Sequence, residues 1–140
     1  MRAPISVIIP TLDVEDVLPA CLAGLMEGVQ AGLIRELIVS DGGSKDATCA
    51  LARSAGAEVI TGTASRGAQL RRGCAQAQGD WLMVLHADTV LQAGWSDVAQ
   101  AHLASGRVGY FKLRFDVRGP MAAWVAAWAN LRSRLFDLPY

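Results

Sequence analysis

The sequence predicts an α/β fold with a mainly parallel central sheet and helices on both faces. Strand-like and helix-like segments alternate four times between residues 5 and 85. The connections between them are short and rich in Gly, Asp and Ser. The first strand-like segment, ISVIIP at residues 5–10, is almost continuously apolar, as is typical of a parallel strand covered on both faces.

The expected strands are short runs rich in β-branched and other apolar residues, and they cover residues 5–10, 36–40, 57–61 and 81–85. The expected helices have apolar residues at helical spacing or capping residues at their ends, and they cover residues 18–29, 46–55 and 65–77. Ser44 or Asp46 is expected to cap the second helix, and Gly32 and Gly56 to end the first two.

The pattern becomes less regular after residue 85. Residues 95–104 predict a helix, and VGYFKLRFDV at residues 108–117 alternates like a strand with one solvated face. Gly119-Pro120 then begins a helix. The 140 residues suit one domain, so we take residues 1–140 as a single domain.

The composition indicates a globular protein. Hydrophobic residues make up 52% of the chain, and 13 basic residues balance 13 acidic ones, which removes the electrostatic basis for nucleic acid as a partner. Three widely spaced cysteines without a C-x-x-C motif favour small buried side chains in a reducing compartment. No segment resembles a signal peptide or a membrane-spanning helix, so we expect a cytoplasmic protein, with peripheral membrane contact as an alternative.

Polar residues follow three of the predicted strands, where the carboxyl ends of parallel strands meet at one edge of a sheet and ligands bind. They are Thr11, Asp13 and Glu15 after the first strand, DGGSKD at residues 41–46 after the second, and His86-Ala87-Asp88 after the fourth. The DGGSKD segment fits either an aspartate that binds a nucleoside or an ordinary turn with helix caps.

Asp88 is the candidate metal ligand, because a divalent cation can bridge one carboxylate and a diphosphate. The alternative for Asp88 is a cap of the following turn. His86 fits a second ligand, a donor behind the ligand, a phosphate contact or a structural residue. Arg66 begins a helix, where its guanidinium can meet an anion, whereas Arg71 and Arg72 are expected on a solvated face.

The last predicted helix carries Trp124 and Trp128 four residues apart, with Arg132 and Arg134 nearby. Packing on the sheet or a homodimer contact is the favoured interpretation of this stripe. A peripheral membrane contact is the alternative, because tryptophan and arginine suit the headgroup region.

Two nucleotide-binding motifs are missing. A dinucleotide-binding domain needs G-x-G-x-x-G after its first strand, and PTLDVED contains no glycine there. The P-loop pattern G-x-x-x-x-G-K-[ST] is also missing from the sequence.

Four segments together resemble family 2 glycosyltransferases with the Rossmann-like GT-A fold, in particular small bacterial members: SVIIPTLD, ELIVSDGGSKDAT, SRGAQLRRGCAQAQGDWLMVLHADT and NLRSRLFDLPY. The resemblance covers essentially the whole chain. It implies transfer of a sugar, with inversion, from a nucleotide-diphospho-sugar to an acceptor hydroxyl. A UDP-sugar is favoured over a GDP-sugar, with Mg²⁺ or Mn²⁺ as the cofactor.

The resemblance also assigns roles by motif position. Asp88 would be the last acid of a D-x-D motif and hold the metal. The residues implied to bind the nucleotide-sugar are Pro10, Thr11, Asp13, Glu15, Asp41, Ser44, Arg66 and His86.

The chain departs from the family pattern at three places. Asp13-Val14 stands where the family usually has Asn-Glu, so Glu15 would take over a carboxylate role. His86 replaces the first acid of D-x-D. The family's catalytic base normally follows a segment like LPY, so we expect it beyond Tyr140 and expect a C-terminally truncated chain without the acceptor part. Asp116 and Asp137 do not match that motif.

Two other functions stay open at this point. One is a non-catalytic nucleotide-sugar-binding or assembly module. The other is a nucleotidyltransferase. Such an enzyme would require a Gly-rich basic loop after the first strand, whereas PTLDVED is acidic. The sequence identifies neither the sugar nor the acceptor.

Overall fold

The computed structural model describes residues 2–115 and 119–136, with side chains described as far as residue 134. It divides into two compact units, Met1–Ala101 and His102–Tyr140. A single domain over residues 1–140 stays a prediction.

The first unit is built on a four-stranded sheet in the order β3-β2-β1-β4, in which every neighbouring pair is parallel. The strands are β1 Ile5–Thr11, β2 Ile34–Asp41, β3 Glu58–Thr61 and β4 Trp81–Val84. This confirms the predicted α/β fold with a mainly parallel sheet.

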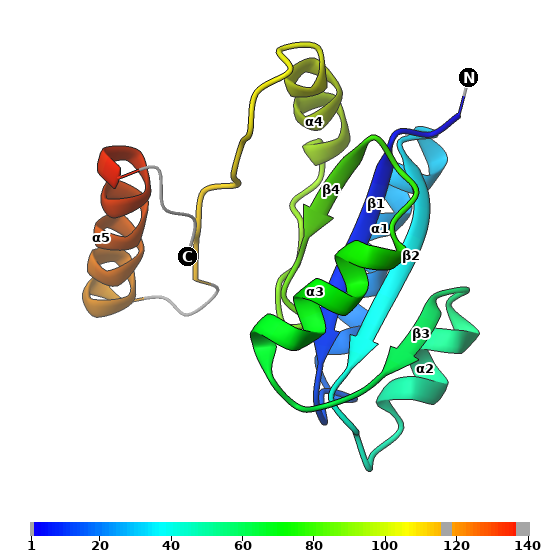
Figure 1. Cartoon of the computed structure of the whole chain (residues 1–140). Coiled ribbons are helices and arrows are strands. Elements are labelled where there is room, and N and C mark those ends of the chain that lie inside the picture. Colours follow the sequence, from blue (N-terminus) through cyan, green and yellow to red (C-terminus); the bar gives the residue numbers. More distant parts are fainter. Residues whose placement is uncertain (1, 116–118, 137–140) are drawn as a thin grey trace. The chain divides into compact units, whose positions relative to one another are not determined.

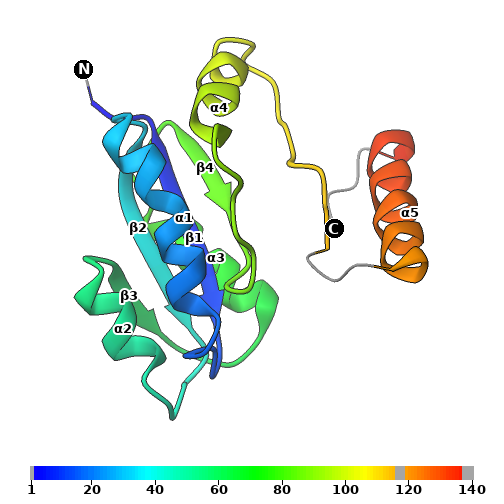
Figure 2. The same ribbon diagram turned by 180° about the vertical axis from the view of Figure 1, so that it is seen from behind.

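Helices cover both faces of this sheet. They are α1 Leu18–Gln30, α2 Thr48–Ser54 and α3 Arg66–Gln76, and a further helix, α4 Trp95–Leu103, contacts α1. α3 lies on the face toward the viewer in Figure 1, whereas α1 and α2 lie on the face that comes forward in Figure 2. The chain steps from β1 to β2 to β3 in one direction and then returns past β1 to β4. Because such crossovers are right-handed, the return places α3 on the opposite face.

The central strand β1 forms the middle of the core. Val7, Ile8 and Ile9 are fully buried, as a strand covered by helices on both faces requires. Ile8 faces α3, where a Cβ atom on Gly73 would clash with it. Glycine at position 73 therefore lets α3 approach the sheet closely.

α1 also holds the start of α4. The indole N–H of Trp95 donates to the carbonyl oxygen of Gly24 at 2.9 Å, and the Trp95 ring lies where a Cβ atom on Gly28 would be. The Glu27 carboxylate accepts from the backbone N–H groups of Gly94 at 2.9 Å and Ser96 at 2.8 Å. Two glycines and one carboxylate of α1 thus fix the first turn of α4.

The second unit contains helix α5, Pro120–Phe136. Residues 108–115 carry no strand, so this part of the predicted strand 108–117 is wrong, and the rest lies outside the described residues. The physical reason lies at Leu113: its backbone N–H donates to the Asn130 side-chain oxygen, and its carbonyl accepts from the Asn130 amide, both at 2.9 Å. A side chain of α5 thus takes the backbone groups that a neighbouring strand would need.

Trp124 and Trp128 are exposed on α5, by 64% and 56%. A homodimer or membrane contact through them stays a prediction. No helix in the part of the chain that the structure describes is long and apolar enough to cross a bilayer.

Candidate functional site

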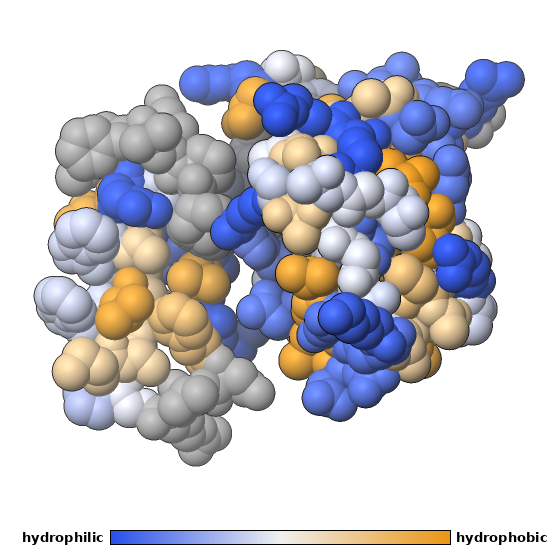
Figure 3. Space-filling model, turned by 60° about the horizontal axis from the view of Figure 1, so that its bottom comes forward, coloured by the Kyte–Doolittle hydropathy of each residue, from blue (hydrophilic) through white to orange (hydrophobic). Residues whose placement is uncertain are grey.

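The candidate site lies at the carboxyl edge of the sheet, where β1, β2 and β4 end. The strand order reverses between β1 and β4, because β2 lies on one side of β1 and β4 on the other. Open α/β sheets bind ligands beyond the carboxyl ends of their strands at such a switch point. Figure 3 brings this end of the molecule forward and shows strongly hydrophilic residues gathered there beside hydrophobic ones.

Asp41, the last residue of β2, is fully buried and anchors the loop after it. Its Oδ1 accepts from the hydroxyls of Thr11 at 2.7 Å and Ser44 at 2.5 Å. Its Oδ2 accepts from the backbone N–H groups of Gly43 at 2.8 Å and Ser44 at 2.7 Å. These four donors occupy the carboxylate from within the chain.

The same contacts control the ionisation of Asp41. Burial raises the pKa of this carboxyl group, but the hydrogen bonds from Ser44, Thr11 and Gly43 outweigh burial and lower the pKa to about 2. Asp41 is therefore a carboxylate at neutral pH, and its charge is balanced by hydrogen bonds that shape the loop.

Asp13 and Glu15 join the loop after β1 to the loop after β2. Asp13 accepts from the backbone N–H of Lys45 at 2.7 Å, and its own N–H donates to the Ser44 hydroxyl at 2.8 Å. Glu15 accepts from the N–H of Ala47 at 2.7 Å, and its own N–H donates to Asp46 at 3.0 Å. Asp13 adopts φ +49°, a left-handed conformation that aspartate tolerates better than most residues. The two predicted acids thus hold the two loops together, and their nucleotide-binding role stays a prediction.

The predicted cap of α2 is corrected by these contacts. Ala47 occupies the N-cap position. Asp46, one residue earlier, accepts from the N–H of Thr48 at 2.9 Å and so supports the first turn from outside it. Ser44 instead bonds to Asp41 and Asp13, because the tight Gly42-Gly43 turn brings its hydroxyl back to the end of β2.

Gln69 of α3 is a site residue that the sequence analysis missed. Its side-chain N–H group donates to the carbonyl oxygens of Thr11 at 2.7 Å and Ser40 at 3.0 Å, and it is 6% exposed. It thus joins the ends of β1 and β2. The available signal was its helical spacing from Gly73, four residues later, which places both on the buried side of α3.

Arg72 corrects a second prediction, because it does not lie on a solvated face. Its guanidinium donates to the carbonyl oxygens of Asp41 and Thr63, each at 3.3 Å, and it lies where a Cβ atom on Gly62 would be. The glycine makes room for the guanidinium beside the backbone. Arg71, the next residue along the helix, is exposed as predicted.

Arg66, His86 and Asp88 form a second group at the carboxyl edge. Nη2 of Arg66 contacts both ring nitrogens of His86, with Nδ1 at 3.1 Å. Burial and the positive charge of Arg66 lower the pKa of His86, and the negative charge of Asp88 opposes them. α3 links this group to the first one, since Gln69 follows Arg66 by three residues and bonds to Thr11.

Pro10 and Cys21 complete the surroundings of the site. Pro10 is half-buried in β1 and pairs with Ser40 of β2. The Cys21 thiol donates to the carbonyl oxygen of His86 at 3.5 Å, and burial, together with the charge of Asp88, raises its pKa to about 12. Cys21 is thus the small buried side chain that the sequence predicts, in contact with the loop after β4.

The donor set fits a metal that the substrate helps to hold. Among the described residues, no three His, Cys, Asp or Glu side chains come together as a metal site. Asp88, however, is an exposed carboxylate whose negative charge acts on His86, the ring that Arg66 contacts. Mg²⁺ and its relatives are commonly bound by one or two carboxylates together with phosphate oxygens, so Asp88 with a diphosphate is a sufficient set.

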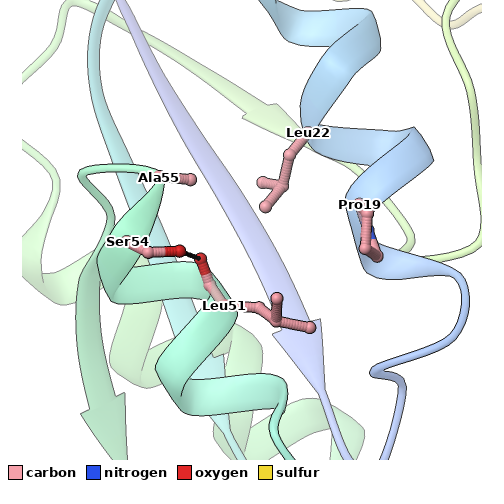
Figure 4. A pocket seen from close by; sticks show the side chains of 5 residues that line it. All are labelled: Pro19, Leu22, Leu51, Ser54 and Ala55. Carbon is pink, nitrogen blue, oxygen red and sulfur yellow. Dashed lines mark hydrogen bonds between the residues drawn. The ribbon is translucent and has the colours of Figure 1, made fainter.

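A cavity of about 240 Å³ lies elsewhere, between α1 and α2 (Figure 4). It is lined by Pro19, Leu22, Leu51, Ser54 and Ala55. The Ser54 hydroxyl donates to the carbonyl oxygen of Leu51 at 2.7 Å, so the one polar side chain of the lining is already bonded. The lining thus contains none of the predicted site residues.

Comparison with known proteins identifies the family of this chain. Residues 6–134 match the model of the family described as glycosyl transferase family 2. A TPR repeat-containing protein of Synechococcus elongatus is 38% identical over 100 residues, which is 69% of this chain and 23% of that protein.

Solved structures are similar as well. Glucosyl-3-phosphoglycerate synthase from Mycobacterium tuberculosis in complex with Mn²⁺ and UDP-glucose is 30% identical with a TM-score of 0.56, over 62% of this chain and 34% of that chain. A further mycobacterial protein is 34% identical with a TM-score of 0.55, over 61% of this chain and 31% of that one. The chain thus spans about a third or less of the length of these relatives. With a family match that runs from β1 into α5, the chain belongs to glycosyl transferase family 2 and has the GT-A fold.

Proposed function

We propose that this chain binds the donor in a glycosyltransferase that moves a sugar from a nucleotide-diphospho-sugar to an acceptor hydroxyl. One observation carries the proposal: at the switch point of the sheet, His86 is contacted by the Arg66 guanidinium and lies within the electrostatic influence of the exposed Asp88 carboxylate. A diphosphate needs both partners, a cation for its own charge and a carboxylate to share a metal.

The donor we propose is a UDP-sugar, because the similar synthase has been solved with UDP and with UDP-glucose. The loops after β1 and β2 would line its nucleoside. The ends of these strands and the loops together contribute Pro10, Thr11, Asp13, Glu15, Asp41 and Ser44. Asp41 already accepts hydrogen bonds from four donors of its own chain. Its main contribution would therefore be to shape the loop that lines the nucleoside.

Asp88 would hold Mg²⁺ or Mn²⁺ together with the donor's phosphate oxygens. When bound, such an ion stabilises the negative charge of the diphosphate as its bond to the sugar breaks. Arg66 would donate hydrogen bonds to the same diphosphate from the α3 side.

The proposed reaction is the inverting transfer that the resemblance to family 2 implies. The acceptor hydroxyl attacks the anomeric carbon from the side opposite to the diphosphate, so a single displacement inverts that carbon. The hydroxyl proton passes to a base, which we assign to no described residue. Asp116 and Asp137 lie outside the described residues.

Titration of the chain with UDP by isothermal calorimetry tests the proposal. We expect binding that strengthens with Mn²⁺, and Asp88→Asn should remove most of the Mn²⁺-dependent gain, at least about tenfold. Asp80→Asn is the matched control, because Asp80 is also exposed but precedes β4 at the amino end of the sheet. Binding that is absent, or that Asp88→Asn leaves unchanged, would overturn the proposal.

Product analysis separates the two alternatives. Incubation with UDP-glucose and 3-phosphoglycerate should release UDP if the chain transfers glucose to that acceptor. We choose this acceptor because the similar synthase has been solved with phosphoglyceric acid. Pyrophosphate released with UTP and a sugar phosphate would indicate a nucleotidyltransferase. Tight UDP-glucose binding without glucose transfer or release of UDP, whichever acceptor is added, would indicate a binding module.

A further inference from the structure

We infer that His86 is a positioning residue: it accepts a hydrogen bond from Arg66, holds the guanidinium toward the diphosphate, and does not bind the metal. This inference rests on the proposed function, because it assigns a role within the same donor site. A D-x-D motif has two carboxylates. In their place this chain would use one carboxylate, Asp88, for the metal and one cation, Arg66, for the diphosphate.

The contact between the two side chains carries the inference. Nη2 of Arg66 contacts both ring nitrogens of His86. A guanidinium has five N–H donors and no acceptor, so the lone pair of the bond must come from the imidazole. A ring nitrogen that accepts from Arg66 has no lone pair left for a metal. In addition, the fixed positive charge of Arg66 repels a divalent cation at that place.

The backbone of His86 is held firmly, so the ring can act as an anchor. The N–H of Leu85 donates to the carbonyl oxygen of Ile8 at 3.0 Å and continues the β1–β4 ladder beyond the last residue of β4. The carbonyl oxygen of His86 accepts from the N–H of Thr89 at 3.0 Å and from the Cys21 thiol at 3.5 Å. The chain is therefore fixed on both sides of the ring.

Arg66 needs such an anchor. It is exposed at the first position of α3, and a free arginine side chain has large rotamer entropy. A contact that limits this freedom before the ligand arrives reduces the entropy lost on binding. The remaining N–H donors of the guanidinium stay available for phosphate oxygens.

The inference predicts how donor binding divides between metal and protein. Because Arg66 contributes without metal, UDP should still bind in EDTA, more weakly than with Mn²⁺. Removing the anchor should weaken UDP binding by the same factor in both conditions.

A double-mutant cycle on UDP binding tests the coupling. Arg66→Met and His86→Leu should each weaken UDP binding about tenfold, and the double variant also about tenfold, because both changes remove the same contact. Arg71→Met is the matched control, since Arg71 is exposed on the same helix, and it should leave the affinity unchanged. Losses that multiply to about a hundredfold, or no loss in either single variant, would overturn the inference.

A conservative variant and a metal titration separate positioning from ligation. His86→Gln keeps an acceptor of similar reach and should restore UDP binding to within about threefold of the original chain. The affinity for Mn²⁺ in the presence of saturating UDP, followed by electron paramagnetic resonance, should fall in Asp88→Asn and stay the same in His86→Leu. A loss of Mn²⁺ affinity in His86→Leu would identify His86 as a metal ligand and overturn the inference.

A ligand-free measurement keeps this test distinct from that of the proposed function. In nitrogen-15 NMR spectra of the free chain, the bond to His86 should slow rotation of the Arg66 guanidinium, and His86→Leu should abolish this effect. Failure of the original chain to bind UDP would reject the proposed function and the inference with it. UDP binding without coupling between Arg66 and His86 would reject the inference alone. Unfolding curves of each variant establish that it is folded.

Discussion

Asp41 and Asp88 show how two residues of one type separate into two roles. Asp41 is fully buried and accepts four hydrogen bonds, whereas Asp88 is exposed beside His86. Asp41 ends β2, Asp88 follows β4, and both are predicted site residues. The neighbouring residues in the sequence do not show which of the two aspartates is buried. Burial and hydrogen bonding depend on which side chains and backbone groups of α3 and of the loop after β1 lie against each strand end.

The first prediction at this scale concerns Asp41→Asn and pH. The pKa of Asp41 is about 2 in the folded chain, below its ordinary value of 3.8. The ionised carboxylate therefore stabilises the folded state above about pH 4, and this contribution is lost as the pH falls from 3.8 through 2. Asp41→Asn should lower the free energy of unfolding by on the order of 2 kcal/mol at pH 7, and by less as the pH falls toward 2.

Urea unfolding of the original chain and of Asp41→Asn at several pH values between 2 and 7 measures this difference. Asp80→Asn serves as the control, because Asp80 is exposed and should leave the free energy of unfolding nearly unchanged. A difference for Asp41→Asn that stays constant with pH would contradict the assigned hydrogen bonds.

The second prediction concerns the buried amide of Gln69. Gln69→Leu keeps a similar volume but removes the donor shared by the carbonyl oxygens of Thr11 and Ser40. We expect a loss of about 1–3 kcal/mol in the free energy of unfolding. Gln76→Leu, on an exposed position of the same helix, should change it little. Equal effects of the two variants in urea unfolding would show that the Gln69 bonds do not hold the strand ends.

At the scale of elements, the hydrophobic pattern and the glycines that end helices are sufficient to predict the sheet and its helices. β1 and α1 appear where the apolar spacing and Gly32 place them, because the pattern reflects burial on both sides of each element. The strand expected at residues 108–117 shows the limit of this reasoning. An alternating pattern only describes which side chains can be buried, whereas a strand also needs a partner for its backbone, and Asn130 takes that place at Leu113.

The third prediction concerns the packing of α4 on α1. Gly28→Ala would add a Cβ atom where the Trp95 ring lies, so it should lower the free energy of unfolding by about 1–3 kcal/mol despite the higher helix propensity of alanine. Gly67→Ala, in α3, meets open space and should be neutral or stabilising by up to about 1 kcal/mol. If thermal unfolding shows Gly28→Ala to be as harmless as Gly67→Ala, the Trp95 ring does not pack on this glycine.

At the scale of the whole molecule, the strand order explains why distant motifs form one site. The segments 11–15, 41–48 and 86–88 are far apart in the sequence, yet parallel pairing of β1 with β2 and β4 brings them to the same edge. The sequence is sufficient to predict this convergence, because every strand of an alternating α/β chain points the same way. The contact of Arg66 with His86 and the bonds of Gln69 depend on the path of α3 over the sheet, and no spacing within the sequence shows that path.

The central claim is that the carboxyl edge of the sheet binds a nucleotide-sugar and a divalent metal. NMR spectra of the nitrogen-15-labelled chain with UDP-glucose test it most directly. With Mg²⁺, shift changes should concentrate on the loops after β1, β2 and β4 and on the start of α3. When Mn²⁺ replaces Mg²⁺, paramagnetic broadening should be strongest around Asp88. Changes centred on the cavity between α1 and α2, or broadening that spares residues 86–89, would contradict the account.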